Sequence, residues 1–239
     1  MISICIATYN GEKYIKEQLL SILQQLSPFD EVIISDDNSS DGTLAIIQDL
    51  NDPRIRVYKN KGDKGYTPNF ENAIGKANGE FIFLSDQDDI WEPNKIKVCM
   101  EYLNKYDYVV SDATIVDKNG ILQAPSFYRK RGARAGLLHN LIRFSYLGCC
   151  IAFKKKLLEK VLPFPPNHRY CTHDNWITII AMAYYKVAII PEPLIKYRRY
   201  DTNTSSGGFS NTTSLWFKVK YRIYIILWLI RRKKSYWIR

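Results

Sequence analysis

The chain has 239 residues, of which 46% are hydrophobic, a length and composition that allow one α/β domain with a tail. Its formal net charge is +10, but residues 203–239 carry eight Lys or Arg and no Asp or Glu, so the first 202 residues carry only +2. The five cysteines include no Cys-x-x-Cys pair, so we expect neither a disulfide framework nor a zinc site. The uncharged first seven residues predict a strand rather than a signal peptide.

Short β-branched runs alternate with segments of helical periodicity over the first hundred residues. The predicted strands are residues 2–7, 31–35, 55–58, 80–84 and 108–111. The predicted helices are residues 12–26, 43–50, 68–77 and 93–105, the third with Thr67 as its N-cap and Gly79 where it stops. Strands joined by helical crossovers pair in parallel, and such sheets bind ligands at the carboxyl ends of their strands.

The alternation loosens after Asp112. The pair Asn119-Gly120 predicts a hairpin, so antiparallel pairing enters here. Beyond a basic cluster at 129–134 we predict a helix over 135–144, a strand over 149–153, a helix over 174–185, strands over 186–190 and 194–200, and a mobile loop over 201–214. The expected fold class is α/β, with a mostly parallel sheet and a small antiparallel addition.

Acidic residues follow several of these elements and are expected to meet at one cleft: Asp36-Asp37, Asp86-Gln87-Asp88-Asp89, Asp112 and Asp174. Three carboxylates within residues 86–89 repel one another unless a cation or a basic partner compensates them. Mg²⁺ or Mn²⁺ suits such a group, because these ions take carboxylate and phosphate oxygens. The alternatives are ordinary turns and helix caps, which favour the same residue types.

Five motifs occur in a fixed order within residues 1–200: Ile-Ala-Thr-Tyr-Asn-Gly at 6–11, Ser-Asp-Asp-Asn-Ser-Ser-Asp-Gly-Thr at 35–43, Asn-Phe at 69–70, Leu-Ser-Asp-Gln-Asp-Asp-Ile-Trp at 84–91 and His-Asp-Asn-Trp at 173–176. Together they resemble family 2 of the inverting nucleotide-sugar glycosyltransferases, and within it the bacterial rhamnosyltransferase-type enzymes of surface polysaccharide assembly. The resemblance implies a GT-A type domain over 1–202, with a nucleotide-binding half (1–112) and an acceptor and catalytic half (113–202). A mobile loop and a basic amphipathic tail follow over 203–239.

The resemblance also implies roles for single residues. Thr8 and Tyr9 would line the nucleotide base pocket, and Asp37 would accept a hydrogen bond from a uracil or thymine imide. Asp86 would lie near the ribose, and Asp88 would bind the Mg²⁺ or Mn²⁺ ion that bridges the donor diphosphate. A diphosphate leaving group needs such a cation because negative charge develops on it.

Asp174 matches the position of the catalytic base in this resemblance. An acceptor hydroxyl needs a carboxylate to take its proton as it attacks the anomeric carbon. Its neighbour His173 is an alternative base or metal ligand, although an isolated His is more often structural.

The chain departs from the resemblance at one position. Many relatives have a His in the segment that corresponds to residues 197–200, and here the matching residue is Tyr200. Arg198 or Arg199 would then supply positive charge to the diphosphate. The Gln-x-x-Arg-Trp motif of processive members is absent, so we expect transfer of a single sugar, with a dTDP-rhamnose or UDP-hexose type donor.

The tail over 216–239 mixes aromatic residues with Lys and Arg. Its uncharged core, residues 223–230, is far shorter than the ~20 residues that span a bilayer as a helix. This composition favours a peripheral position on an anionic membrane, on the cytoplasmic face where a lipid-linked saccharide acceptor would be met. The alternative is a helix packed on the domain or on a second subunit, and the sequence leaves the oligomeric state open.

The resulting hypothesis is a metal-dependent inverting glycosyltransferase that binds no nucleic acid. The main alternative is a membrane-binding or nucleic-acid-binding module without transferase activity, because basic residues interleaved with aromatics also bind nucleic acid. A dinucleotide-dependent oxidoreductase is disfavoured, since no Gly-x-Gly-x-x-Gly follows the first predicted strand.

Overall fold

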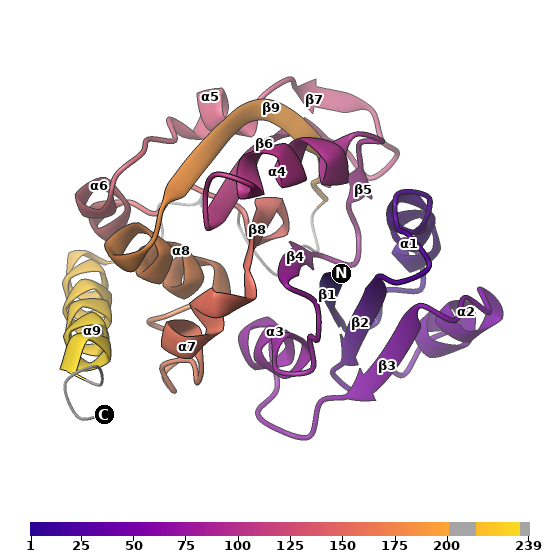
Figure 1. Ribbon diagram of the computed structural model, residues 1–239, viewed down its shortest axis with the longest axis horizontal. Coiled ribbons are helices and arrows are strands. Elements are labelled where there is room, and N and C mark those ends of the chain that lie inside the picture. Colours follow the sequence, from indigo (N-terminus) through magenta and orange to yellow (C-terminus); the bar gives the residue numbers. More distant parts are fainter. Residues whose placement is uncertain (201–213, 235–239) are drawn as a thin grey trace.

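The computed structural model describes residues 1–200 and 214–234. They form an α/β fold in which one curved sheet has helices on both sides (Figure 1). The strands are β1 (Ile2–Thr8), β2 (Glu31–Asp36), β3 (Ile55–Lys59), β4 (Phe81–Ser85), β5 (Ile90–Trp91), β6 (Tyr108–Val116), β7 (Leu122–Ala124), β8 (Ile151–Lys154) and β9 (Val187–Arg198). The helices are α1 (Ile15–Leu23), α2 (Thr43–Asp49), α3 (Tyr66–Ile74), α4 (Lys95–Leu103), α5 (Phe127–Arg131), α6 (Leu137–Ile142), α7 (Leu158–Val161), α8 (His173–Tyr184) and α9 (Leu215–Lys234). Two 3-10 turns, η1 (Gly148–Cys150) and η2 (Lys155–Leu157), flank β8.

The strands lie in the order β3-β2-β1-β4-β8-β6-β9-β5, with β7 paired to β6. The first four strands are parallel, as the helical crossovers predict. β8 is antiparallel to both β4 and β6, so β6 points the same way as β4 without pairing to it. The predicted fold class, a mostly parallel α/β sheet with a small antiparallel addition, is therefore confirmed.

The register of the parallel strands brings their carboxyl ends together. Thr8 pairs with Asp36 across β1 and β2, and Ile6 pairs with Ser85 across β1 and β4. β1, β2 and β4 are buried along almost their whole length because helices cover both faces: α3 lies on one side of β1–β3, and α1 and α2 lie on the other (Figure 1). The loops after β1, β2 and β4 consequently open at the same edge of the sheet.

Several predicted boundaries are wrong for identifiable reasons. α3 begins at Tyr66, because Gly65 takes a φ of 116° that starts the helix early, and Thr67 lies inside the first turn instead of capping it. α3 ends before Gly79, so this glycine does not terminate the helix. It allows the backbone to pass close to β1, because a Cβ at Gly79 would lie 2.7 Å from the Ser3 backbone nitrogen. The two strands predicted over 186–200 are one strand, β9, whose pairing with β6 shifts register near Asp112.

α9 covers most of the predicted tail and packs on the domain beside α6 and α8 (Figure 1). Aromatic side chains of one face, Tyr221, Tyr224 and Trp228, are half-buried against the core, and Ile225 is buried. The predicted loop over 201–214, apart from Ser214, and the last tail residues 235–239 lie outside the described residues. Within the described ranges, no helix combines the length and apolarity needed to span a bilayer.

Candidate active site

A cavity of about 1240 Å³ opens at the carboxyl edge of β1, β2 and β4. Its wall continues through η1, the first turn of α8 and the end of β9. Six of the predicted site residues line this one cavity: Thr8, Tyr9, Asp37, Asp86, Asp88 and Asp174. Residues far apart in the sequence are thus brought to a single space, as expected for strand ends that open at one edge of a sheet.

Asp37 connects the end of β2 to the loop that precedes α3. One carboxylate oxygen accepts a hydrogen bond from Asn60 Nδ2 at 3.1 Å, and the other accepts the Gly65 backbone N–H at 2.8 Å. The Asp37 backbone N–H donates to the carbonyl of Thr8 at 2.9 Å. These bonds hold Asp37 in a single orientation at the cavity wall, with lone pairs left on both oxygens for a ligand N–H donor.

Gln87 is a site residue that the sequence analysis missed. Its side-chain amide accepts the Tyr9 backbone N–H at 2.9 Å and donates to the Tyr9 carbonyl at 3.1 Å, so one amide ties the loop after β1 to the loop after β4. Gly11 makes room for this amide, since a Cβ at Gly11 would lie 2.5 Å from Gln87 Oε1. The position of Gln87 between two aspartates was its only signal in the sequence.

Three acidic residues of the expected cluster do not line the cavity: Asp36, Asp89 and Asp112. Asp36 turns inward, where its carboxylate accepts hydrogen bonds from the hydroxyl of Thr8 at 3.1 Å and the backbone N–H of Ser39 at 2.9 Å. Asp112 is buried and accepts the backbone N–H of Tyr128 at 2.9 Å, which fixes the start of α5. For Asp112 the expectation of a shared cleft is wrong, and for Asp36 the turn interpretation holds.

The segment after β4 forms the acidic part of the site. Asp89 is fully buried; Oδ1 accepts the Arg198 backbone N–H at 3.0 Å, while Oδ2 has no hydrogen-bond partner within the described part of the chain. The ligand atoms of Asp86, Asp89 and Cys149 lie within 4.8 Å of one another. Burial and neighbouring carboxylates raise the pKa values of Asp86 and Asp89 well above the usual range.

This donor set fits a divalent cation. Clustered carboxylates with an unpartnered buried oxygen offer the hard ligands that Mg²⁺ and Mn²⁺ prefer, and a cation would relieve their mutual repulsion. Asp88, the residue expected to bind the cation, lines the cavity as Asp86 does but is not a member of this three-residue group. Cys149 was not anticipated as a neighbour, because β8 enters the sheet beside β4 only through long-range antiparallel pairing.

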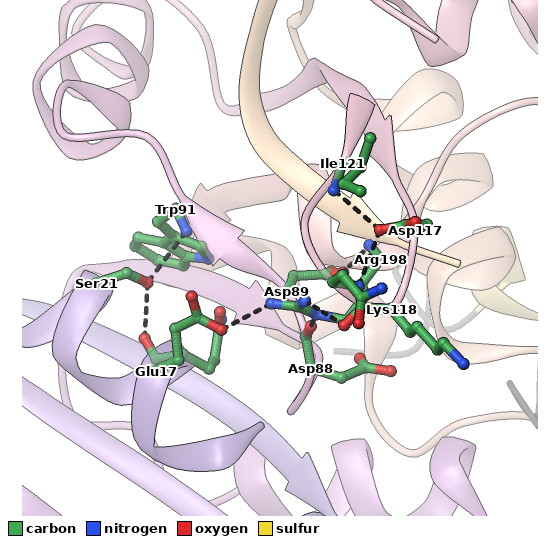
Figure 2. A network of polar contacts seen from close by, with 11 residues as sticks. Glu17, Ser21, Asp88, Asp89, Trp91, Asp117, Lys118, Ile121 and Arg198 are labelled. Carbon is green, nitrogen blue, oxygen red and sulfur yellow. Dashed lines mark hydrogen bonds and ion pairs between the residues drawn. The ribbon is translucent and has the colours of Figure 1, made fainter. Parts of the chain in front are cut away.

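Arg198 does not line the cavity, although we expected it to face a diphosphate. It is 3% exposed, and its guanidinium donates to the Asp88 carbonyl at 2.9 Å, to the Lys118 carbonyl at 3.0 Å and to Glu17 Oε2 at 2.7 Å (Figure 2). The side chain therefore joins the acidic segment to α1 and to the β6–β7 turn. Arg199 also lies outside the cavity wall and donates to the Tyr197 hydroxyl at 3.3 Å.

Tyr200 reaches the cavity where Arg198 does not. Its hydroxyl donates to Asp88 Oδ2 at 2.6 Å, and its ring packs on Tyr14 with the centroids 5.4 Å apart. Burial raises the pKa of Asp88, while the Tyr200 hydroxyl and the two arginines beside it act in the opposite direction. The resemblance placed Tyr200 at a position that is often His, and the structure places it on the carboxylate expected to bind the cation.

Asp174 lies in the first turn of α8. Its Oδ1 accepts the Thr172 hydroxyl at 2.5 Å and the Asn175 backbone N–H at 2.8 Å, so the side chain is fixed at the helix N-terminus while lining the cavity. His173 behind it is 5% exposed and stacks on Phe70 with ring centroids 4.1 Å apart. Both the cap and the base interpretations of Asp174 are compatible with this geometry.

Positive side chains line another part of the same cavity, beside α6 and α9. Within the described residues these are Arg131, Arg143, Arg169, Lys218 and Arg222. Arg131 belongs to the basic cluster at 129–134 that the sequence shows, whereas the other four come from three separate segments. No local pattern predicted that they would meet.

The chain is similar to known proteins both in sequence and in structure. The model of the family described as "Glycosyl transferase family 2" matches residues 3–162. A curated relative, "dTDP-rhamnosyl transferase RfbG" of Shigella flexneri, is 32% identical over 95% of this chain and 79% of its own length. Another, "UDP-Glc:alpha-D-GlcNAc-diphosphoundecaprenol beta-1,3-glucosyltransferase WfgD" of Escherichia coli, is 27% identical over 90% of this chain and 84% of its own length.

Solved structures share the fold. S. aureus TarS 1-349 in complex with UDP-GlcNAc superposes with a TM-score of 0.72 at 21% identity, covering 95% of this chain and 66% of TarS 1-349. The mannosyltransferase PcManGT from Pyrobaculum calidifontis, in complex with GDP-Man and Mn²⁺, gives a TM-score of 0.63 at 21% identity over 96% of this chain and 64% of its own. The chain thus spans about two thirds of these structures. The expected GT-A likeness of the fold is confirmed.

Proposed function

Because this chain belongs to glycosyl transferase family 2 and is a nucleotide-sugar glycosyltransferase of surface polysaccharide synthesis, we propose that it transfers one sugar per reaction, with inversion, from a dTDP-rhamnose or UDP-hexose type donor. The observation that carries this proposal is the convergence of Asp37, Asp88 and Asp174 on one cavity. Family membership decides against the alternative of a binding module without transferase activity. Residues 1–112 supply the nucleotide part of the cavity, and the second half of the domain supplies Asp174 and, together with α9, the acceptor part.

On the donor side, Asp37 accepts a hydrogen bond from the imide of the base, and Thr8 and Tyr9 border the base pocket. The support is the fixed orientation of Asp37 and the bonds that Gln87 makes to the Tyr9 backbone. Asp86, which belongs to the acidic cluster and also lines the cavity, would lie near the ribose. Arg198 and Arg199 are left out of the donor site, because neither lines the cavity.

Asp88, with Asp86 and Asp89 close by, would hold a Mg²⁺ or Mn²⁺ ion. When bound, the ion neutralises the charge that develops on the leaving diphosphate. Solved structural neighbours in complex with Mn²⁺ and a nucleotide or nucleotide sugar support this assignment. The crowding of the described carboxylates and the unpartnered oxygen of Asp89 support it independently.

On the acceptor side, Asp174 takes the proton of the attacking hydroxyl. The Thr172 hydroxyl and the Asn175 N–H both donate to Oδ1, so Oδ2 remains the oxygen available to the acceptor. Attack from the face opposite the leaving diphosphate inverts the anomeric carbon. The proposal is supported by a fixed carboxylate at the start of α8 and an acidic cluster after β4, which both contribute residues to the same cavity.

The acceptor is a saccharide linked to a lipid, and the enzyme works as a peripheral protein on the cytoplasmic face of the membrane. The name of the WfgD relative, which specifies a diphosphoundecaprenol acceptor, supports the first part. The second part rests on α9, which has an exposed apolar face and basic residues.

The test is to incubate the full chain with UDP-, dTDP- and GDP-sugars, with Mg²⁺, with Mn²⁺ and with EDTA, and to measure released nucleoside diphosphate. We expect turnover of one donor class that requires a divalent ion, and a product of inverted anomeric configuration by NMR when a diphosphate-linked GlcNAc acceptor is added. Turnover that is unchanged in EDTA, or a retained configuration, would remove this mechanism. Tight oligonucleotide binding that falls steeply with salt would instead favour a nucleic-acid role.

A further inference from the structure

Five cations line one part of the active-site cavity and are not used by the reaction proposed above: Arg131, Arg143, Arg169, Lys218 and Arg222. They come from α5, from the segment after α6, from the loop before α8 and from α9. The nucleotide part of the cavity is formed by the loops after β1, β2 and β4. α9 and α6 lie at one end of the molecule and α2 lies at the other (Figure 1).

All five cations line the same cavity, and hydrogen bonds connect three of them, Arg131, Arg143 and Arg222. Arg143 donates through NH2 to the carbonyl of Arg131 at 3.2 Å, and Arg222 donates to the carbonyl of Ile142, the residue before Arg143. Burial and the neighbouring Arg143 charge lower the pKa of Arg131. The Arg169 guanidinium lies over the ring of Phe217 on α9, at 5.6 Å from its centroid.

The cluster attracts an anion. Among the described residues, no carboxylate comes within 4.0 Å of the charged groups of Arg143, Arg169, Lys218 or Arg222. The hydrogen bonds that orient Arg143 and Arg222 go to backbone carbonyls, so their charges are not neutralised. Arginine and lysine held in this way are suited to a phosphate or diphosphate group.

α9 adds a second, independent observation. While Lys218 and Arg222, four residues apart, line the cavity, a different face carries exposed apolar side chains at spacings of seven, four and three: Trp216, Ile223, Leu227 and Ile230. Ile223 is 53% exposed and Leu227 is 52% exposed. The exposed Lys220 and Arg231 lie along the border of this stripe, which is the arrangement of a helix that lies in a membrane interface.

We propose that this cationic cluster binds the diphosphate that joins the acceptor saccharide to its hydrocarbon chain, and that the outer stripe of α9 lies in the membrane that holds this chain. The diphosphate of such a lipid sits at the bilayer surface, where one helix offers cations toward the cavity and apolar side chains toward the lipid. The saccharide then extends along the cavity toward Asp174. This inference rests on the proposed function, because it assumes a lipid-linked acceptor.

The anion part is tested by calorimetry on the full chain with farnesyl diphosphate, inorganic diphosphate and farnesol. EDTA is present, so that cation-dependent binding at Asp88 does not contribute. We expect farnesyl diphosphate and inorganic diphosphate to bind and farnesol not to bind, because the proposed contacts are to the diphosphate while the hydrocarbon chain lies in the membrane. Arg143→Gln and Arg222→Gln should each weaken farnesyl diphosphate binding about tenfold, the scale of one charge-assisted hydrogen bond. Lys220→Gln and Arg231→Gln remove the same charge from exposed positions of α9 and should leave binding unchanged.

The membrane part is tested by co-sedimentation with vesicles of phosphatidylcholine and phosphatidylglycerol. The double variant Ile223→Ser, Leu227→Ser should lower the bound fraction about tenfold. Phe29→Ser serves as the control, because Phe29 is 83% exposed and lies between α1 and β2, two elements that lie away from α9 (Figure 1). Equal loss in the control, or no loss in the double variant, overturns this part.

Other outcomes separate this inference from the proposed function. If farnesyl diphosphate fails to bind, or if the two α9 controls lose binding equally, the cluster is not an acceptor site. If Arg143→Gln weakens UDP binding in Mn²⁺ as strongly as farnesyl diphosphate binding, the cations serve the donor instead. Arg143→Lys keeps the positive charge and should keep much of the affinity for farnesyl diphosphate. This result would show that the loss in Arg143→Gln reflects the missing charge and not misfolding. Absence of donor turnover alongside intact farnesyl diphosphate binding would count against the reaction and not against this site.

Discussion

The hydroxyl of Tyr200 donates a 2.6 Å hydrogen bond to Oδ2 of Asp88. The end of β9 is thereby joined to the acidic segment after β4, at the position where the sequence resemblance led us to expect a His. Burial and the neighbouring Asp88 carboxylate raise the pKa of Tyr200, so the phenol keeps its proton and acts as a hydrogen-bond donor. A protonated phenol orients the carboxylate without serving as a ligand to a cation.

Replacing Tyr200 by His should strengthen cation binding. A neutral imidazole nitrogen is a ligand for Mn²⁺, whereas the protonated phenol is not. We expect Tyr200→His to bind Mn²⁺ about tenfold more tightly than wild type in the presence of UDP, measured by electron paramagnetic resonance of free Mn²⁺. Tyr200→Phe removes the hydroxyl without adding a ligand and is the matched variant. Weaker binding by the His variant than by the Phe variant would mean that residue 200 does not reach the ion.

Asp88→Asn should remove most cation-dependent donor binding. The amide keeps the shape of the side chain and an oxygen that accepts the Tyr200 hydroxyl, but it loses the charge that holds a divalent ion. Loss of outer-shell partners alone costs roughly 10- to 100-fold in metal affinity, so we expect at least about a 100-fold decrease in Mn²⁺-dependent UDP affinity by calorimetry. Asp117→Asn, in the β6–β7 turn outside the cavity wall, should leave it unchanged. Persistent cation dependence in Asp88→Asn would shift the ligand to Asp86 or Asp89.

Asp174→Asn should separate chemistry from donor binding. The Asn Oδ1 still accepts from Thr172 and Asn175, so the start of α8 keeps its local bonds, but the side chain no longer takes a proton. Turnover should fall ~10²- to 10⁴-fold while UDP affinity stays the same. Asp49→Asn changes an exposed acid on α2 and is the control. Unchanged turnover would reassign the base, with His173 the nearest other candidate.

His173 should make the protein less stable in acid. Burial lowers the pKa of His173 below its ordinary value of about 6.5, so the neutral ring is favoured in the folded state. Its contribution to stability is fully present above about pH 6.5 and is lost as the pH falls through the lowered pKa. Urea unfolding at about pH 7.5 and pH 5.5 should therefore show a smaller loss of unfolding free energy for His173→Gln than for wild type. His168→Gln replaces a less buried histidine for comparison, and identical losses in all three proteins would contradict the prediction.

Gly79→Ala should destabilise the sheet without touching the site. Its Cβ would lie 2.7 Å from the Ser3 nitrogen and 2.8 Å from the Ile2 carbonyl carbon, and backbone atoms of a central strand do not move aside easily. We expect a loss of about 1–3 kcal/mol in the free energy of unfolding, the scale of overpacking. Gly62→Ala meets only Asn60 Oδ1 at 3.5 Å and should change stability by less than about 0.5 kcal/mol. Similar losses of unfolding free energy in the two variants would show that the backbone of β1 moves to accommodate the added Cβ.

Local patterns predicted the parallel half of the protein well. β1, β2, β3 and β4 lie within one or two residues of their predicted ranges, because β-branched runs between helical segments have few other ways to bury their side chains. The hairpin at Asn119-Gly120 is also present, with Gly120 at a φ of 84° between β6 and β7. The two-residue strand β5 was missed, since so short a run acquires a partner only when β9 lies beside it.

The sequence by itself determined that acidic residues would stand at the ends of parallel strands, since chain order and strand direction fix that edge. Only the tertiary structure decided which carboxylates reach the cavity. Asp37 lies beyond the end of β2 and lines the wall, whereas its neighbour Asp36 ends the strand and bonds inward, because successive strand side chains point to opposite faces. Long-range partners likewise decided that Arg198 packs against Glu17 while Tyr200 reaches Asp88. Such partners are determined by packing across the whole domain, so the spacing of residues along the sequence does not predict them.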